Sequence, residues 1–252
     1  MGARALTTIA IYSMKGGVGK TTIAVNLAWA AATHSGRRTL LWDLDAQAAA
    51  TYILAPRRKS HDEARAVLQL DVAAEALIRP TGIPQLDLLP ADSSLRALDT
   101  VFAEIDRKKR LRRLVEQLDQ RYDRIILDCP PGLGFTSEQI IRGASLILTP
   151  MIPSTLSRRA FTELRQHLNR HHKGTAAVFP VFNMVDRRRV AHRAAIETDP
   201  GCPAIPMASA VEMMADRHAA VGSYAPSSPA AKAFASLWTT IERRIDKAGQ
   251  PT

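Results

Sequence analysis

Residues 7–22 read TTIAIYSMKGGVGKTT, and this stretch decides the fold that we predict. Its first six residues are apolar or β-branched, which is typical of a short buried strand. A glycine-rich segment at 15–22 follows, and residues 22–34 then form an alanine-rich helical pattern. A glycine turn between a strand and a helix can wrap its backbone amides around phosphate groups, whose charge the helix N-terminus favours. The stretch therefore predicts a phosphate-binding loop.

Each residue of segment 15–22 has an expected part in holding a nucleotide. We expect Lys20 to reach the β- and γ-phosphates, Thr21 to hold Mg²⁺ and Thr22 to bond the α-phosphate. The common motif has glycine five residues before Gly19, whereas this chain has Met14 there and a second lysine, Lys15, next to it. The expected nucleotide-binding residues of the segment are Lys15, Gly16, Gly17, Val18, Gly19, Lys20, Thr21 and Thr22.

Strand and helix patterns alternate along the rest of the chain. We expect strands at residues 7–12, 38–44, 86–89, 124–128, 146–149 and 176–183, and helices at 22–34, 95–119, 158–171, 187–196, 211–220 and 229–247. This alternation predicts an α/β fold, with a mostly parallel twisted sheet and helices on both faces. Pro180 is unexpected within a strand because proline cannot donate to a ladder. No linker interrupts the pattern, so we expect one domain over residues 1–252, with a surface loop at 56–62.

The composition excludes several classes of protein and leaves the partner open. The chain of 252 residues is 46% apolar and has two cysteines, which excludes a disordered chain and a disulfide scaffold. No apolar run reaches the length of a membrane span and no secretory signal is present, so we expect a cytoplasmic protein. The net charge of +10 indicates either an arginine-rich surface or a polyanion partner such as nucleic acid.

The segment KGGVGKTT resembles the deviant Walker A motif of the ParA/MinD family of P-loop ATPases. The stretch LLWDLDAQAAAT at 40–51 resembles the family's second motif, and ILDCPPG at 126–132 resembles its Walker B segment. Residues 205–206 and 224–229 resemble C-terminal segments of the ParA branch, so the likeness runs from about residue 7 to 245. Only about 13 residues precede the glycine loop, which resembles the small ParA type without an N-terminal helix-turn-helix domain.

The resemblance implies an ATPase that uses ATP and Mg²⁺, and it assigns roles to particular residues. Lys15 corresponds to the signature lysine that reaches the partner's phosphates in a nucleotide-sandwich dimer. Asp45 corresponds to the residue that orients the attacking water, and Asp43 is expected to shape the Mg²⁺ and phosphate environment. Asp128 corresponds to the Walker B carboxylate, which contacts Mg²⁺ through water. Such an arrangement suits phosphoryl transfer, which needs positioning and charge neutralisation more than covalent chemistry.

The resemblance also implies an adenine site at three further positions: the side chain of Asn183 and the backbone around Pro206 and Met207. Asn183 has the alternative role of a cap or turn residue. Ala46 stands where the family usually has proline, so the loop after Asp45 is expected to differ in conformation.

Basic residues form three features that are candidates for binding duplex DNA without sequence specificity. The resemblance implies DNA binding by the start of the helix at 187–196, with Arg188 nearest to the family's position. The cluster at 107–113 has the alternative role of a solvated helix face beside Leu111, Leu114 and Leu118. The candidate DNA-binding residues are Arg187, Arg188, Arg189, Arg193 and Arg217.

The function expected from the resemblance is that of a ParA-like positioning ATPase. ATP would close a homodimer that binds the nucleoid, and a ParB-type partner on a cargo would stimulate hydrolysis and release. The alternative is a MinD-like ATPase that cycles on the membrane through an amphipathic C-terminal helix, with an apolar stripe at Phe234, Leu237, Trp238, Ile241 and Ile245. That stripe could instead pack on the domain, which makes a membrane partner the weaker expectation. A metabolic ligase on the same fold also stays open.

Overall fold

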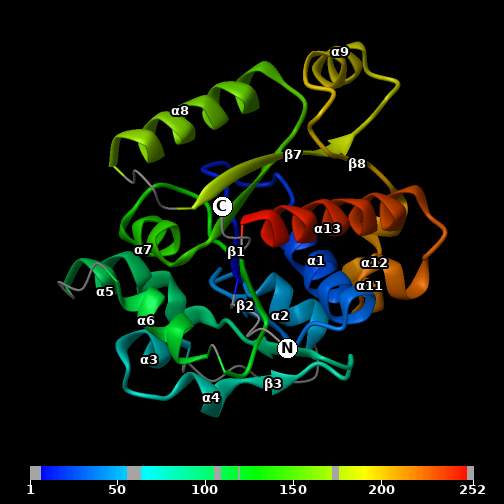
Figure 1. Ribbon diagram of the computed structural model, residues 1–252. Helices are drawn as coiled ribbons and strands as arrows, with labels where there is room; N and C mark the ends of the chain where they lie inside the picture. The colour runs from blue at the N-terminus through cyan, green and yellow to red at the C-terminus, as the bar shows by residue number, and fades with distance from the viewer. Residues whose placement is uncertain (1–6, 56–63, 105–108, 119, 172–175, 249–252) are drawn as a thin grey trace.

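The computed structural model describes residues 7–55, 64–104, 109–118, 120–171 and 176–248. Eight strands form one twisted sheet in the order β3-β4-β2-β5-β1-β6-β7-β8 (Figure 1). Neighbouring strands are parallel except for β3 and β4. The strands are β1 (Thr7–Ile11), β2 (Thr39–Asp43), β3 (Arg79–Pro80), β4 (Leu86–Leu89), β5 (Arg124–Asp128), β6 (Leu146–Met151), β7 (Ala177–Val185) and β8 (Ala204–Pro206).

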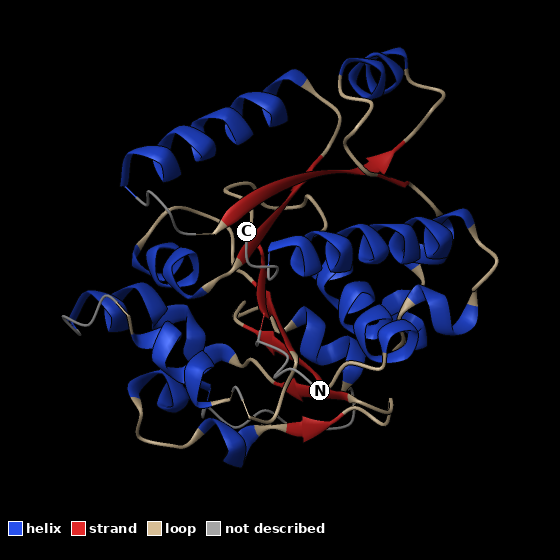
Figure 2. Ribbon diagram, in the orientation of Figure 1, coloured by secondary structure: helices blue, strands red, loops and turns tan. Residues whose placement is uncertain are grey.

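Helices cover both faces of this sheet (Figure 2). One face carries α1 (Lys20–Ser35), α2 (Ala49–Leu54), α11 (Met214–Arg217), α12 (Val221–Tyr224) and α13 (Pro229–Ala248). The other face carries α3 (Ala64–Gln69), α4 (Ala74–Leu77), the 3₁₀ turn η1 (Ser93–Ala97), α5 (Leu98–Glu104), α6 (Arg110–Gln117), α7 (Phe135–Gly143) and α8 (Thr155–His171). The short helices α9 (Val190–Thr198) and α10 (Ser209–Glu212) flank β8 in the sequence. The fold class predicted from the sequence is confirmed.

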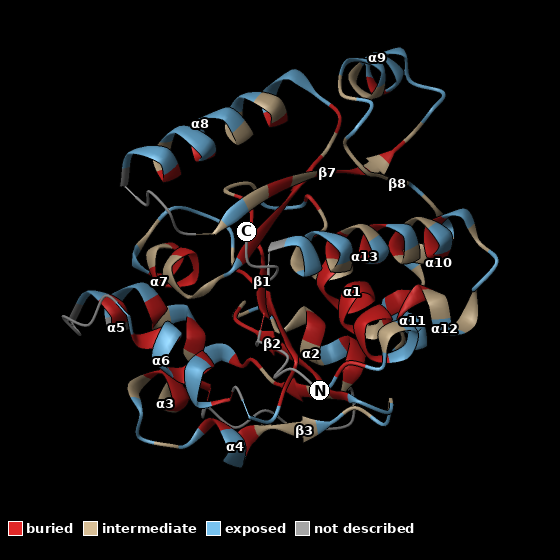
Figure 3. Cartoon of the chain, in the orientation of Figure 1, coloured by how far each residue is buried: buried red, intermediate tan, exposed pale blue. Residues whose placement is uncertain are grey.

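The strand pleat divides the core between the two faces. Ile9 and Ile11 of β1 pack with α1, while Ala10 and Tyr12 pack on the side of α7 and α8. This alternation follows from the two-residue period of a strand. Because both faces are covered, the central strands are buried along their whole length (Figure 3).

Two of the expected helices are wrong in extent. The single helix expected at 95–119 is divided into η1, α5 and α6, and residues 105–108 and 119 lie outside the described residues. The helix expected at 211–220 is split into α10 and α11, where Met213 ends the first helix and precedes the second. Apolar spacing continues across such breaks, so the pattern alone cannot find them. The loop expected at 56–62 also lies outside the described residues.

Pro180 does lie within a strand, and the sheet topology explains why it is tolerated. β8 pairs with β7 only from Phe182 onward, so the stretch of β7 around Pro180 has β6 as its partner on one side. Phe182 donates its N–H to the carbonyl of Pro203 in the direction of β8. The backbone groups of residues 180 and 182 are directed to the same edge of β7. Position 180 therefore has no strand partner on that edge, and the N–H that proline lacks would have had no ladder acceptor there.

The C-terminal helix α13 packs on the domain by its apolar stripe. Phe234, Leu237, Trp238 and Ile241 are all buried against the α1 face of the sheet. The indole N–H of Trp238 donates to the hydroxyl of Ser35 over 2.7 Å. Among the described helices, none is long and apolar enough to cross a membrane. The stripe on which the membrane alternative rested is therefore part of the core.

Candidate nucleotide-binding site

The glycine-rich segment forms a loop at the carboxyl end of β1 and leads into the first turn of α1. Gly17 and Gly19 adopt left-handed backbone angles, with φ of 70° and 85°, which turn the chain sharply into the helix. Gly16 and Gly17 are exposed, whereas Val18 is buried and anchors the loop. The loop and the first turn of α1 therefore present backbone amides to the carboxyl edge of the sheet, as an anion site requires. We call residues 13–19 the phosphate loop.

The phosphate loop is supported from beneath by Asn183. The strand β7 is irregular between Phe182 and Val185, and Met184 has a positive φ of 54°. The buried side chain of Asn183 donates from Nδ2 to the carbonyl of Val18 over 2.9 Å. A Cβ atom on Gly19 would lie 2.1 Å from that Nδ2. Sequence reasoning did not find this supporting contact, because it joins residues 165 positions apart.

The residues expected to contact adenine lie near one another at the end of β7 and β8. Pro206 is opposite Val185 in the strand register, and Met207 donates its N–H to the carbonyl of Val185 over 3.0 Å. Met207 is 56% exposed, whereas Asn183 is buried and contacts the phosphate loop. An adenine contact by these residues stays a prediction.

The two lysines of the loop differ in their surroundings. Lys20 is the first residue of α1 and is only 7% exposed, and its Nζ lies 3.4 Å from the carbonyl of Lys15 as a donor. Lys15 is half-buried, and its own N–H donates to the hydroxyl of Ser13. Lys20 thus holds a positive charge inside the loop, while Lys15 stands nearer the surface.

Two buried carboxylates lie side by side at the carboxyl ends of β2 and β5. Asp43 and Asp128 are opposite each other in the parallel register, and both are 0% exposed. Within the described part of the chain, neither oxygen of the Asp128 carboxylate accepts a hydrogen bond of normal length and angle, although the Thr21 hydroxyl lies close enough to act on it. Burial raises the pKa of Asp128 well above its usual value and the charge of Asp43 raises it further, while Thr21 and Lys20 act in the opposite direction. A buried carboxylate that accepts no well-formed hydrogen bond fits a place that a cation completes.

Asp43 is tied to the segment that follows it. One of its oxygens accepts the N–H of Asp45 over 3.1 Å, and the other accepts the N–H and the hydroxyl of Thr51 over 2.9 and 2.8 Å. Burial raises the pKa of Asp43 to about 6, although these hydrogen bonds oppose the shift. The Thr51 hydroxyl also accepts the N–H of Ala91, which links the segment to the strand-end of β4. Thr51 is a supporting residue that sequence reasoning missed.

Asp45 stands half-buried at the edge of a cavity of about 260 Å³. Its carboxylate accepts the N–H of Gln47, and the turn passes through Ala48 in a left-handed conformation with φ of 53°. Ala46 and residues 130–134 also line the cavity. The carboxylate is therefore positioned by its own turn, and Asp45 borders the cavity beside the loop that follows β5.

Tyr12 fixes that loop from the opposite side. Its buried hydroxyl donates to the carbonyl of Gly132 over 2.6 Å, and burial raises the pKa of Tyr12 to about 12. Gly132 has a φ of 104°, a conformation that favours glycine. The phenol therefore stays protonated and holds the turn after Asp128 in place.

No group of three or more His, Cys, Asp or Glu side chains that could hold a metal ion occurs in the described ranges. A cation at this edge would have the hydroxyl of Thr21 and the carboxylate of Asp128 as its protein groups. Such a sparse set of oxygen donors is typical of Mg²⁺ bound together with phosphates. The Asp128 carboxylate, which accepts no hydrogen bond of normal geometry and has the Thr21 hydroxyl beside it, agrees with that donor set.

The candidate DNA-binding arginines fall on two separate parts of the surface, which Figure 1 places at α9 and α11. Arg187, Arg188, Arg189 and Arg193 are all exposed. Arg188 pairs through two nitrogens with Asp186, and Arg193 donates to the carbonyls of Arg187 and Arg188. These contacts shape the turn before α9. Exposed Arg217 lies on α11, which packs against α2.

The third basic cluster is divided in its role. Arg107 and Lys108 lie outside the described residues. Arg110 is buried and donates to the carbonyl of Gln69 over 2.9 Å, whereas Arg112 pairs with Glu116 on the surface of α6. The leucines at 111, 114 and 118 are buried, so the helix has the solvated basic face that the leucine spacing indicated.

Comparison with known proteins agrees with this architecture. A family described as an AAA domain matches residues 6–178. The chain is 36% identical to the sporulation initiation inhibitor protein Soj of Bacillus subtilis over 57% of each protein. It is 31% identical to the chromosome partitioning protein ParA of Myxococcus xanthus over 73% of this chain and 68% of that protein. The chain spans less than two thirds of the length of several of these relatives, 57% for Soj and 64% for a ParA family protein of Chlamydia trachomatis.

Solved structures show the same fold. The cobyrinic acid a,c-diamide synthase of Mycobacterium smegmatis, with bound ATP analogue and magnesium, superposes with a TM-score of 0.79 at 25% identity and covers 94% of each chain. The cell division ATPase MinD of Pyrococcus furiosus gives 0.79 at 25% identity and covers 94% of this chain and 98% of its own. The phosphate loop and the sheet define a P-loop nucleotide-binding protein. Within that class, the chain belongs to the ParA/MinD family of P-loop ATPases.

Proposed function

We propose that this protein binds ATP with Mg²⁺ at the phosphate loop and hydrolyses it. The observation that carries the proposal is the carboxylate of Asp128, which is fully buried beside Lys20 and Thr21 and accepts no hydrogen bond of normal geometry. Such a group is costly unless a cation or a ligand completes its surroundings. The ATP analogue and magnesium in the synthase structure support the same assignment.

Each residue has a distinct part in the proposed reaction. Lys15 and Lys20 neutralise phosphate charge, and the phosphate loop holds the nucleotide with its backbone amides. Thr21 and Asp128 hold Mg²⁺, which supplies further charge neutralisation when it is bound. Asp45 orients the attacking water, and Asp43 keeps Asp45 and the segment up to Thr51 in place.

We further propose that ATP closes a homodimer through Lys15, and that the dimer binds duplex DNA without sequence specificity. A partner of ParB type on a cargo then stimulates hydrolysis and releases the dimer. This cycle places the protein in the cytoplasm, on the nucleoid. The likeness to Soj and to ParA of Myxococcus xanthus supports the cycle, as does the net charge of +10.

The test is retention of duplex DNA by wild type and by Asp45→Ala, each with ATP and with ADP, at low and moderate salt. We expect Asp45→Ala to keep ATP and to hold DNA with ATP but not with ADP, and to lose it as salt rises. Lys15→Ala should abolish both dimerisation and retention. Asp71→Ala is the matched control, because it removes one negative charge at an exposed site that belongs neither to the phosphate loop nor to the cavity at Asp45.

Three outcomes would count against the proposal. Equal retention with ADP and ATP would exclude a nucleotide switch. Retention by Asp71→Ala equal to that by Asp45→Ala would attribute the effect to charge alone. Dimerisation with ATP but without DNA retention would reject the DNA-binding part and keep the ATPase part.

A further inference from the structure

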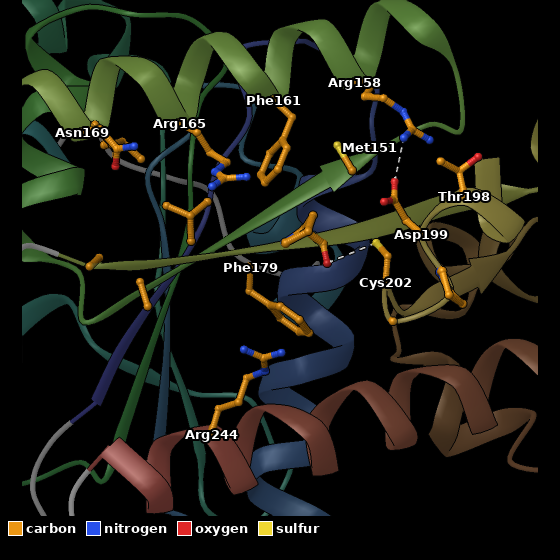
Figure 4. A pocket seen from close by; sticks show the side chains of 17 residues that line it. Met151, Arg158, Phe161, Arg165, Asn169, Phe179, Thr198, Asp199, Cys202 and Arg244 are labelled. Atoms are coloured by element: carbon orange, nitrogen blue, oxygen red, sulfur yellow. Dashed lines mark hydrogen bonds and ion pairs between the residues drawn. The ribbon is translucent and has the colours of Figure 1, made fainter.

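The sheet has an open place beside the first half of β7. β8 pairs with β7 only at Phe182 and Val185, so residues 177–181 have a strand neighbour on one side within the described chain. The helix α8 lies over this edge and α13 lies under it, as Figure 4 shows. Between them is a groove of about 1050 Å³ with residues 176–180 as its floor. We call this groove the edge slot.

The backbone of β7 offers hydrogen-bonding groups to the edge slot. In a parallel sheet, the N–H and C=O of one residue point to the same side and alternate along the strand. Because Phe182 donates toward β8, the peptide groups of Val178 and Pro180 face the slot. Val178 offers a donor and an acceptor, and Pro180 offers a carbonyl, which the Cys202 thiol approaches to 3.5 Å. The slot is therefore an unextended sheet edge of the kind that accepts an added strand.

Three arginines and two phenylalanines are among the side chains that border the slot, and the others include Asp199, Asn169 and several apolar residues. Arg165 of α8 lies over the ring of Phe161 at 5.9 Å, and Arg244 of α13 lies over the ring of Phe179 at 4.1 Å. Figure 4 shows these two arginines entering from opposite sides of the strand. Within the described ranges, no carboxylate lies within ion-pair distance of either one, whereas Arg158 is paired with Asp199 at 2.9 Å.

We propose that the edge slot binds an extended acidic segment of a partner protein, which pairs with β7 and extends the sheet. Side chains of an added strand point alternately to the two faces of the sheet. Acidic side chains on one face would meet Arg165, and those on the other would meet Arg244. A guest carboxylate in this partly enclosed slot would form charge-assisted hydrogen bonds with a guanidinium that the ring already orients.

The edge slot is separate from the phosphate loop in both residues and chemistry. None of the residues that line it belongs to the phosphate loop, to the pair Asp43 and Asp128, or to the turn at Asp45. The inference therefore holds or fails independently of the proposed ATPase. The arginines also attract nucleic acid, but its sugar-phosphate backbone has no N–H groups that would pair with Val178 along the strand.

The test is selection of a phage-displayed library of random ten-residue peptides on the full-length protein. We expect enriched peptides to carry Asp or Glu at several positions and to lack proline. A fluorescein-labelled peptide from the selection should bind Arg244→Glu at least about tenfold more weakly than wild type in anisotropy, and Arg165→Glu/Arg244→Glu more weakly still. Alternate peptide bonds of the labelled peptide can be N-methylated in two ways, at the odd or at the even positions. One of these two patterns should weaken binding by a similar factor, because it removes the N–H groups that form hydrogen bonds with β7.

Arg243→Glu is the matched control, since Arg243 is exposed on α13 beside Arg244 but does not line the slot. Arg243→Glu should bind the peptide as wild type does. All the substituted proteins should keep the wild-type circular dichroism spectrum and melting temperature. Selection that yields no acidic peptides would overturn the proposal, as would equal weakening by Arg243→Glu. Insensitivity to N-methylation in both registers would reject strand addition. A short DNA duplex could also displace the labelled peptide from the wild-type protein. If it did so, and if Arg243→Glu prevented this displacement, the slot would be part of a general polyanion-binding surface, and the proposal would be rejected.

Discussion

Position 19 requires glycine for two independent reasons. Its φ of 85° is a backbone conformation that residues with a Cβ rarely adopt, and the space where a Cβ would lie is taken by Asn183. Asn183 in turn uses its Nδ2 to hold Val18. One small residue thus lets β7 approach the phosphate loop closely enough to support it.

Gly19→Ala should therefore destabilise the fold and weaken nucleotide binding together. We expect the free energy of unfolding to fall by about 1–3 kcal/mol, from backbone strain and the displaced Asn183 side chain. Urea denaturation and nucleotide titration calorimetry measure the two effects. Gly16→Ala is the control for stability, because no atom lies within 4 Å of the place that its methyl group would take and its φ is not in the left-handed region. Equal destabilisation by both substitutions would contradict the close-approach explanation.

At the scale of the element, the packing of α13 shows which role its amphipathic sequence has in the fold. A stripe of large apolar residues at helical spacing suits a membrane surface and a protein core equally well. In the structure the stripe faces α1 and the sheet, and Trp238 is fixed to Ser35. Glu242 on the same helix pairs with Arg37 and Arg124, which ties α13 to the amino ends of β2 and β5.

Leu237→Ala tests this packing. Leu237 is 1% exposed, so its truncation should lower the free energy of unfolding by about 2–5 kcal/mol, through lost burial and the cavity left behind. Thr239→Ala, on the exposed side of the same helix, should change it by less than about 0.5 kcal/mol. Thermal or chemical denaturation gives both values. A stable Leu237→Ala protein that had lost ATP-dependent binding to anionic vesicles would favour the membrane alternative.

At the scale of the whole molecule, the excess of positive charge is spread over separate surfaces. The turn before α9 presents Arg187 and Arg189 to solvent, while the basic face of α6 presents Arg112 and Arg113 elsewhere. Arg188 already shares its charge with Asp186. The net charge alone cannot distinguish these surfaces, because counterion release depends on which cations meet the phosphates.

The double substitution Arg187→Ala/Arg189→Ala should reduce DNA retention in the ATP state and lower the slope of log K against log salt by about 1.8. Arg112→Ala/Arg113→Ala removes the same charge from α6 and should leave the slope nearly unchanged. Filter binding over a salt series measures both. If the α6 pair produced the larger change, the DNA surface would have to be assigned to that helix. The ATP-dependent dimer should form in both variants, which size-exclusion chromatography would check.

Local patterns in the sequence were enough to predict the phosphate loop, the central strands and the fold class. A strand, a glycine turn and a helix are each specified by neighbouring residues, so TTIAIYSMKGGVGKTT could be interpreted without the rest of the chain. The helix at 95–119 was wrong because its apolar spacing continues across the breaks between η1, α5 and α6. The spacing of leucines also could not show that Arg110 would be buried while Arg112 stays exposed.

Contacts between distant strands were decided only by the tertiary structure. The sheet order brings Asp43 beside Asp128, and the irregularity in β7 brings Asn183 beneath Val18. The edge slot exists because β8 is too short to cover β7. The sequence by itself determined the central strands, the fold class and the phosphate loop, since those depend on local backbone preference and periodicity, whereas the short strands β3 and β8 and the helix α7 were not predicted. The order and lengths of the paired strands determined which side chains meet, since that depends on how the whole chain packs.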